Sequence, residues 1–143
     1  MSLTKWDTRF LELAQLVSTW SKDPSTKVGA VIATPDNVVV SVGYNGFPRG
    51  VSDDGRLVDR EIKYMNTIHA EMNALMFANR SVEGCTLYTQ PFQPCSRCAS
   101  CIIQSGIKKV VTQVLSKQHQ RWYNDFRNAR SMFEEAGVEL LEI

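Results

Sequence analysis

The chain has 143 residues, 43% of them hydrophobic, and its 16 basic and 15 acidic side chains leave a formal net charge of +1. This length and apolar content fit one domain, over residues 1–143, that buries a core without disulfides or structural metals. The balanced charge weighs against nucleic acid or an anionic membrane as a partner, and no apolar run approaches the roughly 20 residues that span a bilayer.

The first predicted element is an amphipathic helix from Leu3 to about Ser21, because apolar residues recur there at helical spacing. These residues are Trp6, Phe10, Leu13, Leu16, Val17 and Trp20. Charged residues interrupt the apolar ones, so the segment does not have the pattern of a signal peptide, and we expect a cytoplasmic protein.

Two short β-branched runs come next, at residues 28–33 and 37–44, with the turn-like sequence TPDN between them. This pattern predicts a β-hairpin. Residues 45–57 are rich in Gly, Pro and Asp and predict a loop. Residues 51–66 show no clear period, so we assign no helix or strand to them.

The second half of the chain alternates helices with strands. A helix capped by Thr67 is predicted to run to about Asn79, with Ala70, Ala74, Leu75 and Ala78 facing inward. The elements after it are a strand at 85–90, a helix from about Cys95 to Ser105 that Pro94 opens and Gly106 ends, a strand at 108–115, a helix at 121–137 with Gly137 as C-cap, and a strand at 138–143. This order predicts an α/β fold in which helices cover both faces of a mixed sheet.

Three residues of this half have side chains of the types that bind zinc: His69, Cys95 and Cys98. Catalytic zinc sites use three protein ligands and keep a fourth position for water. The two cysteines lie one turn apart at a predicted helix start, where the helix dipole favours thiolates. Glu71 could lie beside the metal without binding it, take a proton from the zinc-bound water and pass it to a substrate nitrogen.

Other interpretations stay open at this point. A Cys-x-x-Cys pair is also typical of half a structural zinc site or of a redox pair, and Cys101 could complete a closed Cys₃His site. Cys85 begins an apolar strand, and we expect it to be a small core residue. His119 lies in a polar segment, and we expect it to be solvated.

The sequences HAE (69–71) and PCSRC (94–98) match the H-x-E…P-C-x-x-C signature of the zinc nucleobase deaminases. The wider chain resembles one branch of them, the deoxycytidylate (dCMP) deaminases. The supporting stretches are SKDPSTKVGAVI, GYNGFPRGVSDD, HAEMNAL, CTLYTQPFQPCSRCA, IIQSGIKKVV and FEEAGVEL, which cover most of residues 20–140. The resemblance implies a three-layer α/β/α sandwich with a mixed five-stranded sheet.

The resemblance also implies an activity, the zinc-dependent hydrolytic deamination of dCMP to dUMP and ammonia, which supplies deoxynucleotide for dTMP synthesis. His69, Cys95 and Cys98 would bind zinc, and a zinc-activated water would attack C4 of cytosine. Glu71 would protonate N3 and then the departing amino group. Some relatives hold a second zinc ion in the loop after GYNG, but residues 45–68 contain no Cys or His, so we expect one zinc ion per chain.

Contacts to the base and the sugar are carried over from the same resemblance. The backbone of Ala70 and the region of Pro94 would hold the base edge. Asn45, in the GYNG stretch, matches the family asparagine that binds the sugar, although YNG also fits a plain turn.

A 5′-phosphate requires cations or amide donors near the mouth of the pocket. Lys27 is the best-placed candidate, followed by Arg49 and Arg121, and each of them could equally be a solvated surface charge. Trp122 and Tyr123 could wall the pocket or pack in the core. The stretch LYTQPFQPC and the loop that includes RWYND are each longer than is usual in the family, so details of the pocket wall, phosphate recognition and base selectivity are not carried over from it.

Three functions are therefore compatible with the sequence. The favoured one is dCMP deamination. The second is the same chemistry on CMP, deoxycytidine, a 5-substituted dCMP or an adenosine in tRNA, and the third is a non-enzymatic structural-zinc binding module. The resemblance further implies a homo-oligomer, either a hexamer or a dimer, with dCTP and dTTP as effectors and Mg²⁺ accompanying a nucleotide effector.

Overall fold

The structure is a computed structural model that describes residues 3–113 and 122–143. In chain order its elements are α1 (Lys5–Ser18), β1 (Gly29–Ala33), β2 (Val39–Tyr44), the short 3₁₀ helix η1 (Gly55–Leu57), α2 (Arg60–Asn66), α3 (Ala70–Phe77), β3 (Thr86–Gln90), α4 (Ser96–Gln104), β4 (Lys109–Thr112), α5 (Tyr123–Ala136) and β5 (Glu139–Glu142). None of the helices within these ranges is long and apolar enough to cross a membrane.

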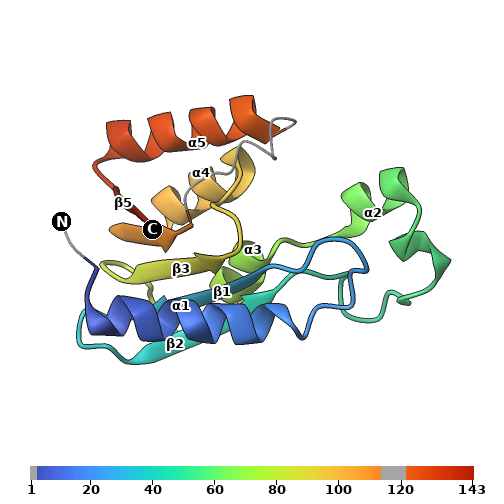
Figure 1. The fold of residues 1–143 in the computed structure, drawn as a ribbon, viewed down its shortest axis with the longest axis horizontal. Helices are drawn as coiled ribbons and strands as arrows, with labels where there is room; N and C mark the ends of the chain where they lie inside the picture. The colour runs from blue at the N-terminus through green and yellow to red at the C-terminus, as the bar shows by residue number, and fades with distance from the viewer. Residues whose placement is uncertain (1–2, 114–121) are drawn as a thin grey trace.

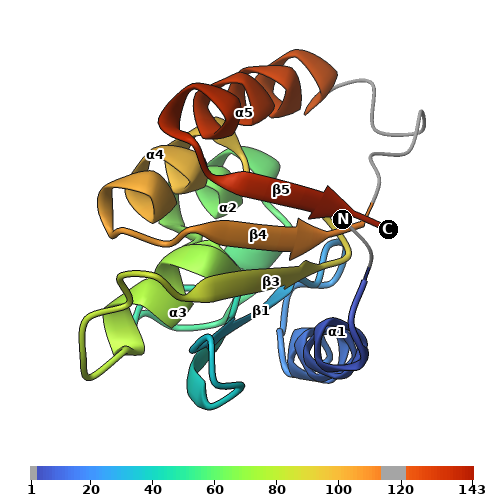
Figure 2. The same ribbon diagram turned by 90° about the vertical axis from the view of Figure 1, so that its left-hand side faces the viewer.

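The five strands form one mixed sheet in the order β2-β1-β3-β4-β5. Strand β1 is antiparallel to both of its neighbours, β2 and β3, whereas β3, β4 and β5 are parallel to one another. Helix α1 covers one face of the sheet, and α3, α4 and α5 cover the other (Figures 1 and 2). The predicted three-layer α/β/α sandwich with a mixed five-stranded sheet is confirmed.

Alternation along the strands divides the core into two layers. Ile32 and Leu87 face α3, α4 and α5, whereas the neighbouring Val31 and Tyr88 face α1. Cys85 is almost fully buried in the first layer, so its predicted place in the core is confirmed.

Two glycines let helices pack directly on the first hairpin. A Cβ atom on Gly29 would collide with the backbone of α1, and one on Gly43 would collide with the carbonyl of Ala70 and lie 2.5 Å from the amide nitrogen of Ala74. Real Cβ atoms do not approach backbone atoms this closely, so β2 and α3 are in contact only because residue 43 lacks a side chain.

Helix α1 is attached to the sheet through a buried carboxylate. Thr4 and Asp7 form a capping box at the start of the helix, and Asp7 also accepts a hydrogen bond of 2.8 Å from the Tyr88 hydroxyl. Burial of Asp7 opposes ionisation, but hydrogen bonds from Thr4 and Tyr88 and the charge of Lys109 outweigh it and lower the pKa of this carboxyl. The helix is therefore fixed on β3 by a charged group rather than by apolar packing alone.

The largest difference from the sequence prediction is α2, in the segment to which we assigned no element. Asp59 caps this helix by accepting a hydrogen bond from the amide of Ile62. No residue of α2 is buried, so the helix carries no apolar period that the sequence could reveal. Together η1 and α2, residues Gly55–Asn66, form an arm that projects from the body of the molecule (Figure 1).

The predicted N-cap of α3 is wrong. Thr67 ends α2, and its hydroxyl donates a hydrogen bond to the carbonyl of Lys63. Helix α3 begins later, at Ala70, and His69 is its N-cap. A threonine side chain can bond either to the turn before it or to the turn after it, and the helix upstream decides the choice here.

Smaller differences concern element ends. Helix α1 is shorter than predicted, and Leu16 and Trp20 are half-exposed instead of forming part of its inner face. The predicted strand at 108–115, the predicted helix at 121–137 and His119 each fall wholly or partly on residues 114–121, which lie outside the described ranges. The described parts of these elements are β4 and α5, and Gly137 caps α5 in the left-handed conformation, as predicted.

The contact at Gly43 generates a stability prediction. Gly43→Ala should push α3 away from β2 and lower the free energy of unfolding by about 1–3 kcal/mol, because the backbone atoms that it meets cannot rotate away. Urea denaturation followed by circular dichroism would measure the effect. Gly55→Ala is the matched control, since a Cβ there meets nothing within 4 Å. Equal stability of the two variants would contradict this account of the packing.

Candidate metal centre and active site

Strand pairing brings three distant segments to one edge of the sheet. Gly29, the first residue of β1, pairs with Tyr44 at the end of β2 and with Gln90 at the end of β3. The segments just beyond these positions, residues 26–28, 45–46 and 91–95, therefore meet at the same edge. Helices α3 and α4 also begin there.

His69, Cys95 and Cys98 form a compact group at this edge. Their ligand atoms all lie within 4.8 Å of one another, and the two sulfur atoms lie 3.4 and 3.3 Å from the Nδ1 atom of His69. Tetrahedral zinc bound by sulfur and nitrogen at its usual distances separates the two donor atoms by about 3.6 Å. The donor set and its spacing therefore fit zinc. Cys101 is exposed and does not belong to this group.

The contact between the two cysteine side chains shifts their pKa values in opposite directions. The hydrogen bond from Cys98, together with that from His69, lowers the pKa of Cys95 to about 4. The same contact with Cys95, together with burial, raises the pKa of Cys98. The lowered pKa of Cys95 favours a thiolate there, and a divalent cation would supply the positive charge needed to ionise Cys98 as well.

Glu71 lies in the first turn of α3 and is only 4% exposed. Burial raises the pKa of its carboxyl to about 7, although the positive charge of neighbouring His69 acts in the opposite direction. A carboxyl group with a pKa near neutrality can both accept and release a proton at that pH. Its predicted position beside the metal ligands, without being one of them, matches the geometry.

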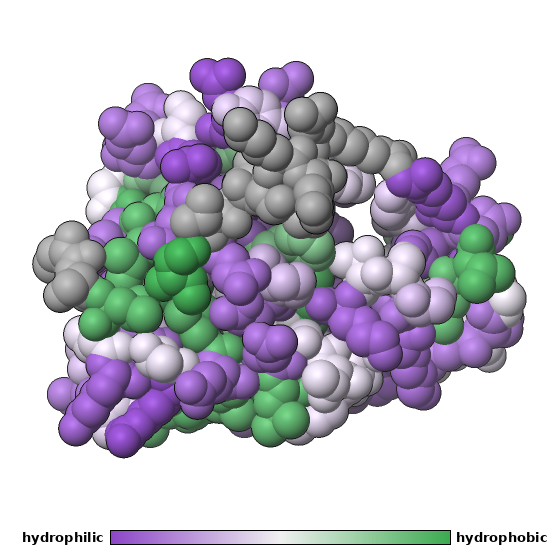
Figure 3. All heavy atoms as spheres, viewed as in Figure 1, coloured by the Kyte–Doolittle hydropathy of each residue, from purple (hydrophilic) through white to green (hydrophobic). Residues whose placement is uncertain are grey.

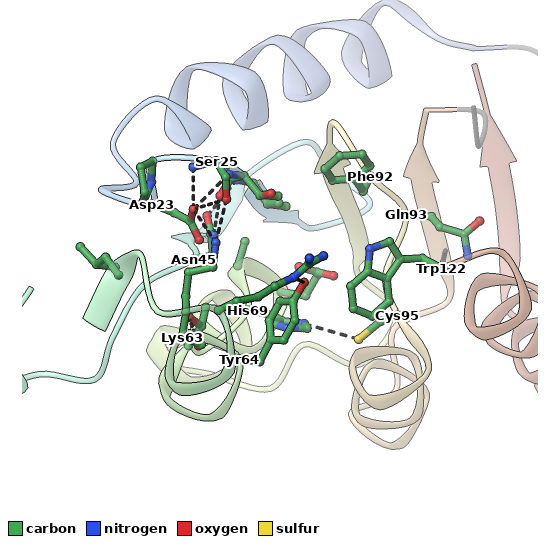
Figure 4. A pocket seen from close by; sticks show the side chains of 18 of the residues that line it. Asp23, Ser25, Asn45, Lys63, Tyr64, His69, Phe92, Gln93, Cys95 and Trp122 are labelled. Atoms are coloured by element: carbon green, nitrogen blue, oxygen red, sulfur yellow. Dashed lines mark hydrogen bonds and ion pairs between the residues drawn. The ribbon is translucent and has the colours of Figure 1, made fainter. Parts of the chain in front are cut away.

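The group opens into a cavity of about 770 Å³, a size typical of small-molecule sites. Its lining combines the sheet edge, the arm and the start of α5. The lining residues are Asp23, Pro24, Ser25, Thr26, Val28, Asn45, Leu57, Val58, Arg60, Lys63, Tyr64, Thr67, His69, Ala70, Glu71, Phe92, Gln93, Cys95, Trp122 and Phe126. Figure 3 shows the surface hollowed between the arm and the body, and Figure 4 shows the side chains that face one another across the cavity.

Three of the substrate-binding residues predicted from the sequence line this cavity: Asn45, Ala70 and Trp122. The Oδ1 atom of Asn45 accepts a hydrogen bond from the amide of Val28, and its Nδ2 atom donates one to the carbonyl of Thr26. Trp122 stands 5.9 Å from the ring of Tyr64, in an edge-to-face contact. It walls the cavity, one of the two positions that the sequence left open.

Other predicted residues lie elsewhere. Pro94 is fully buried behind the lining, between Gln93 and Cys95. Lys27 is exposed and is not part of the lining, although both of its neighbours are. The guanidinium of Arg49 lies over the ring of Phe77, on the outer side of α3. Arg121 lies outside the described residues.

Sequence reasoning missed the contribution of the arm. Arg60, Lys63, Tyr64 and Thr67 all line the cavity, and their spacing of three, four and seven residues places them on one helix face. The Nζ atom of Lys63 lies 3.2 Å from the buried carboxylate of Asp23 and donates a hydrogen bond of 2.7 Å to the Ser25 hydroxyl. The signal present in the sequence is a polar stripe at helical spacing, which apolar periodicity does not detect.

A second feature that sequence reasoning missed connects α4, which carries Cys98, to the start of α5, next to Trp122. Cys95 is the N-cap of α4, but its side chain makes no capping hydrogen bond. Asp125, from the first turn of α5, accepts a hydrogen bond of 3.0 Å from the amide of Ser96, and its carbonyl accepts one of 2.9 Å from the Ser96 hydroxyl. Asp125 thus caps the helix from outside and holds the start of α5 against the metal ligands.

Comparison with known proteins places this geometry in context. Residues 4–114 match the family model of the cytidine and deoxycytidylate deaminase zinc-binding region. An uncharacterized deaminase in the luxG 3′ region of Aliivibrio fischeri is 50% identical over 139 residues, which cover 96% of this chain and 93% of that protein. The human deoxycytidylate deaminase is 40% identical over 141 residues, which cover 94% of this chain and 77% of the human one.

Solved structures show the same fold. The dCMP deaminase of cyanophage S-TIM5 in its apo form superposes with a TM-score of 0.78 at 23% identity, covering 99% of this chain and all of that one. The structure of that enzyme in complex with dCMP and dUMP superposes with a TM-score of 0.76 at 22% identity, over the whole of both chains.

Metal content tests the composition of the centre. Cys98→Ser should remove zinc from the purified protein, because a neutral hydroxyl replaces a thiolate ligand, whereas Cys101→Ser should retain it. Atomic absorption after exhaustive dialysis would measure zinc per chain. Loss of zinc in the Cys101 variant would instead support a closed structural site.

Removal of the external cap should weaken the same centre. Asp125→Ala should lower the free energy of unfolding by about 1 kcal/mol, the usual contribution of a capping residue, and should speed the transfer of zinc to a colorimetric chelator. Glu135→Ala, at an exposed position of the same helix, is the matched control. Identical zinc-release rates in the two variants would show that Asp125 does not stabilise α4 and the zinc ligands that it carries.

Proposed function

Because the chain belongs to the cytidine and deoxycytidylate deaminase family, we propose that it catalyses the zinc-dependent hydrolytic deamination of dCMP to dUMP and ammonia. One observation carries this proposal: a His-Cys-Cys group that fits zinc lies beside a buried carboxyl on the floor of a nucleotide-sized cavity. Similarity to the deoxycytidylate deaminases of human and mouse, at 40% and 41% identity, supports dCMP as the substrate rather than another cytosine compound.

In this proposal His69, Cys95 and Cys98 hold the zinc ion. When bound, zinc supplies a Lewis acid that lowers the pKa of a coordinated water to about 7. The neutral imidazole and two thiolates leave the centre without excess positive charge, and Glu71 lies within the same pocket. The chain's own contribution to the chemistry is then the movement of protons by Glu71.

Glu71 accepts a proton from the attacking water and delivers it to N3 of cytosine as the water oxygen adds to C4. The carboxylate then takes the second proton from that oxygen and transfers it to the amino group. The C4–N bond breaks, ammonia leaves and the C4 carbonyl of uracil forms. One carboxyl serves first as base and then as acid, a role that suits its pKa of about 7.

Substrate orientation follows from the residues around the centre. The backbone of Ala70, at the start of α3, and the segment next to Pro94 would hold the base edge. Asn45 would bind the sugar, because its amide nitrogen and oxygen each make one hydrogen bond to the backbone and each can make a second. Trp122 and Phe126 would cover the base from the side of α5.

The remaining expectations have two sources. A single domain over residues 1–143 and a cytoplasmic location rest on the length and composition of the sequence. A homo-oligomer (hexamer or dimer), regulation by dCTP and dTTP, and Mg²⁺ accompanying a nucleotide effector rest on the family resemblance alone. Within the described residues, His69, Cys95 and Cys98 form the one group able to hold a metal, consistent with one zinc ion per chain.

The same chemistry on CMP, deoxycytidine or 5-substituted dCMP is the second candidate function, because the cavity has room beyond the base. A structural-zinc module is disfavoured by Glu71, since burial of a carboxyl beside the ligands destabilises its charged form and has no role in a structural site. The near-zero net charge weighs against an adenosine in tRNA.

Ammonia release on a panel of dCMP, CMP, deoxycytidine and 5-substituted dCMP tests the proposal. We expect the rate of ammonia release from dCMP to be well above the rates from CMP and deoxycytidine. Glu71→Gln should reduce kcat by roughly 10²- to 10⁴-fold and retain zinc, because it removes the general acid–base group but no metal ligand. Full activity of this variant, or zinc-loaded protein inactive on every substrate, would refute the proposed reaction.

A further inference from the structure

We propose that Arg60 on the arm, which lines the same cavity as His69 and Glu71, binds the substrate's anionic group and thereby sets the preference for a nucleotide over a nucleoside. This inference rests on the proposed deamination and concerns the part of the cavity that the arm lines. It differs from the sequence prediction, in which Lys27 was the best-placed candidate for this role and Arg49 and Arg121 were weaker ones.

The position of Arg60 along the chain supports this assignment. The cavity-lining face of α2 carries Arg60, Lys63 and Tyr64. Thr67, which ends the helix, also lines the cavity, and His69 follows two residues later. At 1.5 Å per residue, the Cα atom of Arg60 lies about 10 Å from that of Thr67 along the helix axis, and its guanidinium lies beside Tyr64, between the two. A pyrimidine nucleotide likewise carries its reacting carbon at one end and its phosphate at the other.

The charges of the lining favour Arg60 over Lys63. These two residues supply the Lys and Arg side chains among the described lining residues. Lys63 is already neutralised by the buried carboxylate of Asp23 and is held by Ser25, so it fixes the arm to the loop before β1 (Figure 4). Among the described residues, Arg60 forms no ion pair, so its full charge is available to a ligand.

Arg60 is also held in place by a neutral partner. Its Nε atom donates a hydrogen bond of 3.1 Å to the Tyr64 hydroxyl, and its guanidinium carbon lies 5.7 Å from the centre of the Tyr64 ring. Tyr64 in turn contacts Trp122 across the cavity. With Nε engaged, the two terminal nitrogens keep four N–H donors, and this fork matches the oxygen atoms of a phosphate.

Parallel kinetics on dCMP and deoxycytidine test this role. Arg60→Gln should lower kcat/KM for dCMP roughly 10- to 100-fold, the contribution expected of hydrogen bonds to a charged group, and leave kcat/KM for deoxycytidine nearly unchanged. For Arg60→Lys, kcat/KM for dCMP should lie between the values of the wild-type protein and Arg60→Gln. Lysine keeps the positive charge but lacks the two terminal nitrogens that bind a phosphate together. Arg56→Gln is the matched control, since Arg56 lies on the same arm, outside the lining, and pairs with Asp54.

Two results would overturn the inference: a dCMP-to-deoxycytidine ratio in Arg60→Gln equal to that in Arg56→Gln, or an equal loss on both substrates. A selective loss in Lys27→Gln but not in Arg60→Gln would return the role to Lys27. Calorimetric binding of dUMP and deoxyuridine to the zinc-loaded protein applies the same comparison without turnover. If the wild-type protein deaminates neither substrate, the proposed function fails, and the calorimetric ratio alone decides whether Arg60 recognises a phosphate.

Discussion

The placement of β1 between two antiparallel neighbours is the constraint on which the site depends. Because Gly29 pairs with both Tyr44 and Gln90, the start of one strand and the ends of two others share one sheet edge. Asn45 and Gln93 reach the cavity from segments that are far apart in the sequence. A slip of one residue in this pairing would turn every side chain to the opposite face and disperse the site.

The metal centre uses helix starts at the expense of ordinary capping. His69 and Cys95 are the N-caps of α3 and α4, and neither side chain caps its helix, because both point to the metal group. For α4 the missing acceptor comes from Asp125 on α5. The helix that supplies two metal ligands and the helix that supplies the aromatic wall are thereby held as one unit.

The arm is held in place by other kinds of contact than the rest of the fold. The body is fixed by two apolar layers, whereas α2 buries no residue and is attached through polar and aromatic contacts: Lys63 with Asp23 and Ser25, and Tyr64 with Trp122. In Figure 3 this end of the molecule is mostly hydrophilic. An element held this way can carry charged groups to the mouth of a cavity, because it does not have to present an apolar face to a core.

The strands, the helices with an apolar face, the candidate zinc-ligand set and the neighbouring Glu71 could be predicted from the sequence. Those features are local: β-branched runs mark strands, and two cysteines three residues apart must lie on one helix face. Three features depend on how separate elements pack and could not be predicted: the existence of α2, the place of Arg60 and Lys63 rather than Lys27 in the cavity lining, and the capping of α4 by Asp125. Apolar periodicity reports burial alone, so it cannot reveal polar contacts between residues such as Ser96 and Asp125, which packing of separate elements creates.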